Sequence, residues 1–578
     1  MASETYQEIR EHAWSAATEV LARRGFAERG RGRWLNADLD WGHWRGPVWV
    51  HIPDGFPWQL PEVVVEDGAE YRPHVERSGK VCVAPATGLL LDFTRPGRIV
   101  EDVLEQAKQL LRPSTPKASA LEIEREYQAY WTIDGGGKAF VSVRAGTADG
   151  SVKAEKLPGQ GLVLLASSDT DDFGRWKAAL GGRGSTTVAC YFVRLSKPLP
   201  APPRHRAWTL LQYLTEIERR CDEARFKTLL DWAQATLLPY AILVGMPSND
   251  AHGSLCCAYV RFPASKTGEE NKRNGFRKNK FPAAWAFKLA LPERIDPLRT
   301  ERIDHEFLVA RTGGDSSLGS ARACVFGMGS VGSFFTMALA RAGVGNLRLI
   351  DPERITAANL HRHFLGASSI DQWKAEAMSR ELSQKLPNVR VEHRPETADG
   401  VFAAKPGFVS ECELVASATG EESIELAIAA RVTNGQHRLH VWVEPLGLGG
   451  HVLALPRNAA SGCLRCLFDH NDKGELTNLA SLAEPGQEFQ RTLGGCAGSF
   501  TPFGASDAEV IAATAASWGT RLLLGRVERP TLISWVNDRS RLVNAGFRLS
   551  RRGQTLEERR MHVHENFARP DCPRCGGA

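Results

Sequence analysis

The most constraining feature of this sequence is a short apolar run that ends in a glycine-rich turn. Arg322–Phe326 is typical of a buried strand. Gly327, Gly329 and Gly332 follow it directly, before a helical pattern. Glycines let the backbone approach a phosphate closely, and the N-terminus of the following helix offers unpaired N–H groups to it. The motif therefore predicts a nucleotide-binding strand–turn–helix unit.

The segments after this turn alternate between strand-like and helix-like patterns. The strand-like runs cover 347–351, 389–391 and 414–418, and a helix-like run covers 371–386. This alternation predicts a doubly wound parallel α/β sheet. Asp351 ends the second strand, 19 residues after Gly332, where a carboxylate can hold a ribose hydroxyl. On these residues alone, an NAD-dependent enzyme is the favoured interpretation.

The residues after Asp351 change that interpretation. Asn359 is followed by Leu, His and then Arg362, and Lys374 lies on the next predicted helix. This pattern closely resembles the ThiF-like adenylating family, which includes ubiquitin-activating enzymes and the activators of sulfur-carrier proteins. The resemblance implies that Asp351 holds the ribose of ATP, while Asn359, Arg362 and Lys374 meet its phosphates. The Arg and Lys cations neutralise the charge that builds up when a carboxylate attacks the α-phosphate. The alternative interpretation is a solvated basic helix face.

A magnesium ligand is harder to assign. The family usually carries Asp-x-Thr-Asp after the fourth strand, and its last aspartate binds Mg²⁺. Residues 417–422 of this chain read Ser-Ala-Thr-Gly-Glu-Glu instead. Glu421 and Glu422 are the candidates for the missing carboxylate.

The twelve cysteines of the chain include two C-x-x-C pairs. The four residues are Cys463, Cys466, Cys572 and Cys575. Four thiolates in two such pairs are typical of a structural Zn²⁺ site, with ordinary buried thiols as the alternative. The same family resemblance includes a zinc site at about this place in the fold. The adjacent Cys256 and Cys257 point to opposite faces of a predicted strand, so we expect them in the core.

Cys496 lies in a glycine-rich stretch between Gly494 and Phe500. A thiolate is a strong nucleophile, and a thioester retains the energy of an adenylate. Activating enzymes that form thioesters carry a cysteine on a comparable crossover loop, so the resemblance implies that Cys496 captures the activated carboxylate. A packed loop cysteine is the alternative.

The first 112 residues show a different pattern. Helical spacing over 6–24 precedes strand-like runs at 33–35, 47–52 and 62–65, a proline-rich turn and a second amphipathic helix over 99–111. With His74 and Cys82 between the turn and the last helix, this order resembles a ubiquitin-conjugating domain. The resemblance implies that Cys82 carries a thioester. The alternative is a buried strand cysteine.

One departure from the conjugating family lies close to Cys82. His74, Val75 and Glu76 stand where that family has His-Pro-Asn, whose asparagine stabilises the oxyanion as an amine attacks the thioester. An ionised Glu76 has no proton to donate. Either another hydrogen-bond donor stabilises the oxyanion in this protein, or the amine attacks the thioester by different chemistry.

The chain is long enough for several domains. At 578 residues we predict a conjugating-like domain over 1–112, a linker over 113–118, an α+β domain of unknown role over 119–310 and an adenylation domain over 311–578. The small net charge of +5 gives no reason to expect nucleic acid. No apolar run is long enough to span a bilayer, and the polar N-terminus is unlike a signal peptide, so we expect a cytoplasmic protein.

The two domain types together resemble the bacterial activating–conjugating fusion enzymes of CBASS antiphage operons. The resemblance implies that ATP and Mg²⁺ activate the C-terminal tail of a cGAS-like nucleotidyltransferase, or a ubiquitin-like protein. The acyl group would then pass from Cys496 to Cys82 and on to a target lysine. It also implies a homodimer.

Two other functions remain open from the sequence. One is a sulfur-carrier or cofactor-biosynthesis adenylyltransferase whose N-terminal domain only docks a partner. The other is a scaffold that recruits a tail or a ubiquitin-like protein without ATP chemistry. The altered magnesium and His-Pro-Asn motifs favour the scaffold.

Overall fold

The computed structural model describes residues 5–29, 33–66, 73–76, 78–84, 88–112, 127, 131, 137–144, 147–200, 206–247, 253–262, 282–433, 435–492 and 499–576. Contacts divide the chain into two units, residues 1–168 with 184–302 and residues 169–183 with 303–578. The predicted Cys496 and the predicted linker over 113–118 lie outside the described residues.

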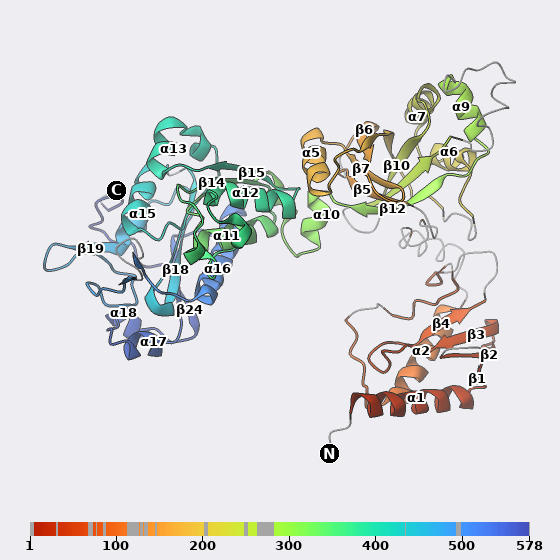
Figure 1. The fold of residues 1–578 in the computed structure, drawn as a ribbon, viewed down its shortest axis with the longest axis horizontal. Helices are drawn as coiled ribbons and strands as arrows, with labels where there is room; N and C mark the ends of the chain where they lie inside the picture. The colour runs from red at the N-terminus through yellow and green to blue at the C-terminus, as the bar shows by residue number, and fades with distance from the viewer. Residues whose placement is uncertain are drawn as a thin grey trace. The chain divides into compact units, whose positions relative to one another are not determined.

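The N-terminal part is an antiparallel sheet in the order β1-β2-β3-β4, with two helices that pack against each other (Figure 1). Its elements are α1 (Tyr6–Arg23), β1 (Ala27–Glu28), β2 (Trp34–Asp40), β3 (Arg45–His51), β4 (Glu62–Val65) and α2 (Pro96–Leu110). Alternate strand residues such as Val48 and Val50 are fully buried under the helices. The predicted helices and strands are confirmed here.

The middle part is a mixed sheet that closes on itself. Its described strands are β5 (Lys138–Ser142), β6 (Gly150–Lys156), β7 (Val163–Ser167), β8 (Thr186–Thr187), β9 (Ala189–Arg194), β10 (Tyr240–Met246), β11 (Ser254–Val260) and β12 (Asp296–Arg302). They follow the order β7-β5-β12-β11-β10-β9-β6-β8, and β6 also pairs with β7. Seven of these strands therefore form a barrel, with β8 beside β6.

The barrel has one core inside and another outside. Cys257 packs into the inner core, whereas its neighbour Cys256 packs into the outer core. The outer core also takes side chains from α6 (Leu210–Glu218), α7 (Glu223–Ala235) and α9 (Ala283–Ala290). The two cysteines occupy opposite faces and are fully buried, as predicted.

The C-terminal part contains the predicted doubly wound sheet, in the order β15-β14-β13-β16-β17-β18-β23-β24. The first five strands in this order are parallel, and the chain adds three antiparallel strands. Its strands are β13 (Arg322–Phe326), β14 (Asn346–Ile350), β15 (Arg390–Arg394), β16 (Leu414–Ser417), β17 (His437–Val443), β18 (Gly449–Leu455), β23 (Thr531–Val536) and β24 (Arg560–His564). Short pairs are formed by β19 (Phe468–His470) with β20 (Leu476–Asn478) and β21 (Arg491–Thr492) with β22 (Ser499–Phe500).

Helices cover both faces of this sheet. One core joins the sheet to α11 (Ser330–Arg341), α12 (Lys374–Lys385) and α16 (Ala505–Leu523). The core on the other face includes α13 (Ala398–Ala404), α14 (Gly407–Ser410) and α15 (Glu422–Arg431). The remaining helices of this unit are α5 (Thr170–Ala179), α10 (His305–Ala310), α17 (Ser540–Asn544) and α18 (Arg551–Thr555).

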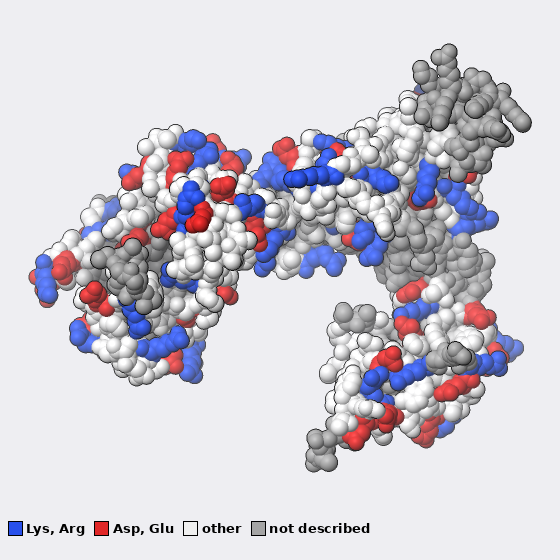
Figure 2. All heavy atoms as spheres, viewed as in Figure 1, with Lys and Arg blue, Asp and Glu red and all other residues white. Residues whose placement is uncertain are grey.

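The chain order reverses between β13 and β16, and ligands bind at such a reversal in open α/β sheets. Acidic and basic side chains are interspersed over the face of this unit drawn in Figure 2. Among the described residues, no helix combines the length and apolar composition needed to cross a membrane.

Candidate functional site

The glycine turn lies between β13 and α11. Gly327 has a positive φ of 85°, and a Cβ there would lie 2.6 Å from the carbonyl oxygen of Ala418. A Cβ on Gly332 would lie only 1.8 Å from the carbonyl oxygen of Gly327. At Gly329, the N-cap of α11, an added Cβ meets nothing within 4 Å. The turn is therefore packed on its inner side and open where the helix N-terminus offers its N–H groups.

Asp351 follows β14 and is tied to this turn. Its carboxylate accepts hydrogen bonds from the backbone N–H groups of Met328, at 2.6 Å, and Glu353, at 2.8 Å. The residue is buried, and burial raises the pKa of Asp351, a shift that the charge of Lys374 opposes. Asp351 thus lies at the predicted nucleotide end of the sheet.

Lys374 begins α12 and is buried, with its ammonium paired to the carboxylate of Glu353. Because Glu353 also donates its N–H to Asp351, the three residues form one charged cluster beside the turn. The structure therefore brings Asp351 and Lys374 together, and their roles toward ATP remain a prediction.

The other two predicted phosphate ligands make contacts of their own. Asn359 caps its own short turn, since its side-chain oxygen accepts the backbone N–H of Thr356 at 2.9 Å. The Arg362 guanidinium lies over the ring of Phe503, 5.3 Å from its centroid. Their contact with phosphates remains a prediction.

His363 was missed by the sequence analysis. This buried imidazole contacts the Met328 carbonyl oxygen through Nε2 at 2.6 Å, and its Nδ1 accepts the backbone N–H of Leu365 at 3.0 Å. The second bond requires the proton on Nε2, which then donates to Met328. Burial lowers the pKa of His363, so the neutral form braces the turn. Its place one residue after Arg362 was the only signal in the sequence.

A second missed residue lies where a magnesium ligand was sought. Glu425 of α15 accepts the backbone N–H of Thr419 at 2.9 Å and lies 3.1 Å from Nδ1 of His440. It also accepts the hydroxyl of Ser417. Burial opposes ionisation, but the bonds from His440, Ser417 and Thr419 outweigh it and lower the pKa of Glu425. This carboxylate holds the loop after β16.

The two candidate magnesium ligands lie next to that loop. Glu421 and Glu422 are both exposed. The carboxylate of Glu422 accepts a hydrogen bond from the amide of Asn478 at 2.8 Å. This contact assigns no metal, and the magnesium role of Glu421 and Glu422 remains a prediction.

The four C-x-x-C cysteines meet in space. Their sulfur atoms all lie within 4.8 Å of one another, with separations of 3.7 Å for Cys463 and Cys572 and 3.4 Å for Cys466 and Cys575. A tetrahedral ion with Zn–S bonds of about 2.3 Å requires sulfur atoms about 3.8 Å apart. The cluster therefore fits a tetrahedral metal ion.

Cys82 lies on a small hairpin of the N-terminal part. Val75 pairs with Val81, and the Cys82 N–H donates to the His74 carbonyl oxygen at 2.7 Å. Both valines are buried, whereas Cys82 is exposed. The Cys82 thiol lies 3.6 Å from the Glu76 carboxylate, within hydrogen-bond distance for a sulfur donor. The alternative of a buried strand cysteine is therefore wrong.

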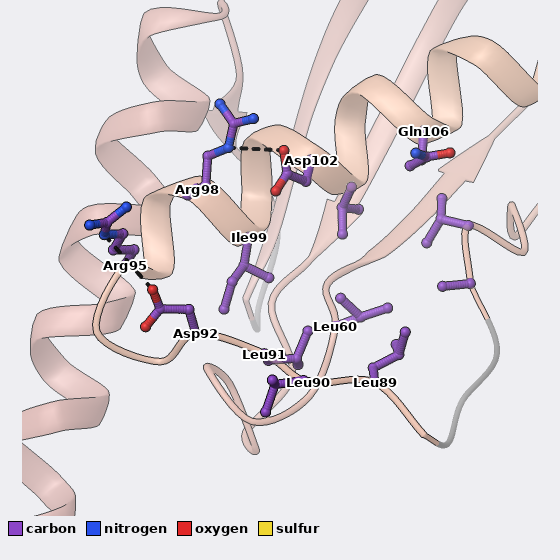
Figure 3. Close-up of a pocket in the computed structure, with 13 residues that line it drawn as sticks. Leu60, Leu89, Leu90, Leu91, Asp92, Arg95, Arg98, Ile99, Asp102 and Gln106 are labelled. Atoms are coloured by element: carbon purple, nitrogen blue, oxygen red, sulfur yellow. Dashed lines mark ion pairs between the residues drawn. The ribbon is translucent and has the colours of Figure 1, made fainter.

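A pocket of about 310 Å³ begins directly after Cys82. Figure 3 shows loop residues Leu89 and Leu91 across the pocket from Ile99 on α2, whereas Leu90 is fully exposed. Val83 and Ala84, which follow the cysteine directly, also line the pocket. Two ion pairs lie at its rim, between Arg95 and Asp92 and between Arg98 and Asp102. The pocket offers an apolar lining with a charged border.

Two regions of the chain match known protein families. Residues 305–561 match the ThiF family, and residues 45–139 match the prokaryotic E2 family B. One region of the chain is therefore similar to the ThiF family, and another is similar to the prokaryotic E2 family B.

Among its relatives, the chain is 31% identical over 250 residues to the ATP-dependent ubiquitin transferase-like protein Cap2 of Pseudomonas aeruginosa, covering 42% of this chain and 41% of that protein. The Cap2 protein of Enterobacter hormaechei is 23% identical over 299 residues, 49% of each chain. The sulfur carrier protein ThiS adenylyltransferase of Escherichia coli is 26% identical over 163 residues, 28% of this chain and 64% of that protein. The matched region thus spans less than two thirds of the length of each of these relatives. Over these parts of its length the chain is similar to Cap2 proteins.

Proposed function

We propose that this chain uses ATP to activate the C-terminal carboxylate of a partner protein as an acyl-adenylate. The acyl group is then captured as a thioester, passes from Cys496 to Cys82, and is ligated to a lysine amine. The observation that carries the proposal is the presence, in one chain, of the Asp351 and Lys374 cluster beside a glycine turn and an exposed Cys82 in an E2-type domain.

The residues around the turn fit an ATP molecule. The open side of Gly329 leaves room for phosphate, and Asp351, bonded to the turn at Met328, would hold the ribose. Lys374, Arg362 and Asn359 would face the phosphates, and the Lys374 and Arg362 cations would offset charge that develops as the carboxylate attacks. Mg²⁺ would be held by Glu421 or Glu422. The ATP supplies the adenylyl group.

The four-cysteine cluster would hold Zn²⁺ as a structural ion. Thiolates in a closed set of four leave no open coordination position, so the ion would stabilise the fold and take no part in the transfer.

The partner proposed here is the C-terminal tail of a cGAS-like nucleotidyltransferase, with a ubiquitin-like protein as the other candidate. The similarity to Cap2 proteins supports this choice. The pocket beside Cys82 offers a place for an apolar side chain of the bound tail. We also propose that the protein acts in antiphage defence and ligates the partner to a target lysine. We propose in addition that it is cytoplasmic and forms a homodimer.

A second candidate function is adenylation of a sulfur-carrier protein. The similarity to the ThiS adenylyltransferase favours it. It predicts a persulfide at Cys496 and no role for Cys82 in the reaction. The exposed thiol on an E2-type hairpin favours conjugation instead.

The experiment incubates the full chain with ATP and the C-terminal domain of a candidate nucleotidyltransferase. We expect an adduct that dithiothreitol cleaves and that is absent without ATP and in Cys496→Ala. In Cys82→Ala the adduct should remain on Cys496 without transfer to lysine. Cys221→Ser serves as the control, because this half-buried cysteine lies outside every proposed site. An adduct of unchanged yield in the Cys82→Ala, Cys496→Ala double variant contradicts the relay. A persulfide at Cys496 with full activity of Cys82→Ala supports the second candidate.

A further inference from the structure

The hairpin around Cys82 places its side chains on two faces. Because side chains alternate along a strand, the paired Val75 and Val81 point into the core. Glu76, Lys80 and Cys82 are displaced by one residue from these valines and share the outward face. The backbone bond from the Glu76 N–H to the Lys80 carbonyl oxygen, 2.8 Å long, fixes this register.

The outward face carries the ammonium group of Lys80 and the carboxylate of Glu76. The Lys80 ammonium donates to the Glu62 carboxylate at 2.6 Å. That bond is the main reason why the pKa of Lys80 is raised, and the charges of Glu76 and Cys82 add to the shift. Lys80 therefore remains a cation beside the thiol and its carboxylate neighbour.

A carboxylate 3.6 Å from a reacting sulfur constrains the chemistry. An ionised Glu76 has only acceptor oxygens, so it cannot stabilise an oxyanion by donating a hydrogen bond. It also disfavours a thiolate at Cys82, because two negative charges at this distance repel each other. The arrangement instead suits a group that accepts a proton and then returns it to sulfur.

We propose that Glu76 is the general base of the ligation step at Cys82, an inference that rests on the proposed function. The carboxylate takes one proton from the ammonium group of the acceptor lysine. The neutral nitrogen attacks the thioester carbonyl carbon, the C–N bond forms, and the C–S bond breaks with its electron pair on Sγ. The Glu76 carboxyl then protonates Sγ, and the second proton lost by nitrogen goes to water. The products are an amide and the Cys82 thiol.

The test loads the full chain without ATP, so that it does not depend on the adenylation site. All variants carry Cys496→Ser, and the probe is a fluorescent diglycine peptide as its 2-mercaptoethanesulfonate thioester. Thiol exchange places the peptide on Cys82, and Cys82→Ser verifies the position. The loaded protein is separated from the probe and mixed with free lysine or with hydroxylamine, and loss of the thioester is followed in time.

Glu76→Gln is expected to slow discharge to lysine about a hundredfold, the usual contribution of a general base. Discharge to hydroxylamine should change less than about twofold, because this amine is already neutral near neutral pH and needs no base. Glu105→Gln, the same change at an exposed position on α2, is the matched control and should leave both rates unchanged.

The possible results distinguish the role of Glu76 as a base from the role of Cys82 in thioester transfer. If Glu76→Gln discharges to lysine at the wild-type rate or faster, Glu76 is not the base, while thioester transfer by Cys82 still stands. If both nucleophiles slow equally, Glu76 only positions the thiol, and the inference is wrong. If the probe never loads Cys82, the inference and the proposed function both fail.

Discussion

Gly332 and Gly329 belong to the same turn, yet an added methyl group meets different surroundings at the two positions. At Gly332 it would lie 1.8 Å from a backbone oxygen, whereas at Gly329 it would enter open space. Gly332→Ala is therefore expected to lower the free energy of unfolding by about 2 kcal/mol or more without nucleotide. Gly329→Ala should keep this stability but weaken ATP binding, because its methyl group occupies the side left open for phosphate.

Thermal unfolding of both variants with and without ATP tests this difference. The wild-type protein and Gly329→Ala should unfold at similar temperatures without ATP, and only the wild type should gain stability when ATP is added. A Gly332→Ala protein that unfolds at the wild-type temperature contradicts the steric argument.

Residues of this turn could be predicted because their constraint is local. Gly327 and Gly332 are needed by a backbone that folds within six residues, and the sequence shows that spacing directly. His363 and Glu425 could not be predicted, because their partners lie far along the chain. His363 contacts Met328, and Glu425 contacts His440. Burial of a polar side chain depends on such distant partners, which periodicity does not reveal.

The pairing of secondary-structure elements is also hard to predict from sequence, because paired strands can lie far apart along the chain. Apolar patterns located β2, β3 and β4 of the N-terminal sheet and the strands β13 to β16 of the C-terminal sheet within a few residues, but they missed β17, β18, β23 and β24. They did not indicate that β6 pairs with β7 and closes the middle sheet into a barrel. Apolar periodicity reports which face of a strand is buried, and it carries no information on which strand lies beside it.

The two C-x-x-C turns form an element whose metal can be tested. Purified wild-type protein is expected to contain about one zinc ion per chain, because four sulfur ligands complete a tetrahedral site. Cys463→Ser should lose this zinc and unfold at a lower temperature, since metal binding contributes to folding stability. Elemental analysis by mass spectrometry measures the ion.

The control for the zinc site is Cys221→Ser, which alters a cysteine outside the cluster and should retain the ion. Zinc retained in full by Cys463→Ser would show that this thiolate is not a ligand. A wild-type protein without zinc, with all four thiols open to alkylation, would leave the cluster as ordinary packed cysteines.

At the scale of the molecule, the two proposed chemistries belong to separate structural units, each with its own hydrophobic core. Substitutions in independent sites without shared partners have separable effects. Lys374→Ala is therefore expected to abolish ATP–pyrophosphate exchange and still accept the peptide thioester probe at Cys82. Cys82→Ser should show the reverse, with exchange retained and the adduct absent.

Exchange is measured with labelled pyrophosphate and the same candidate partner, and the adduct by fluorescence on a non-reducing gel. Loss of probe loading in Lys374→Ala, or of exchange in Cys82→Ser, would mean that one site depends on the other. A relay of two independent steps predicts that each variant fails only at its own step.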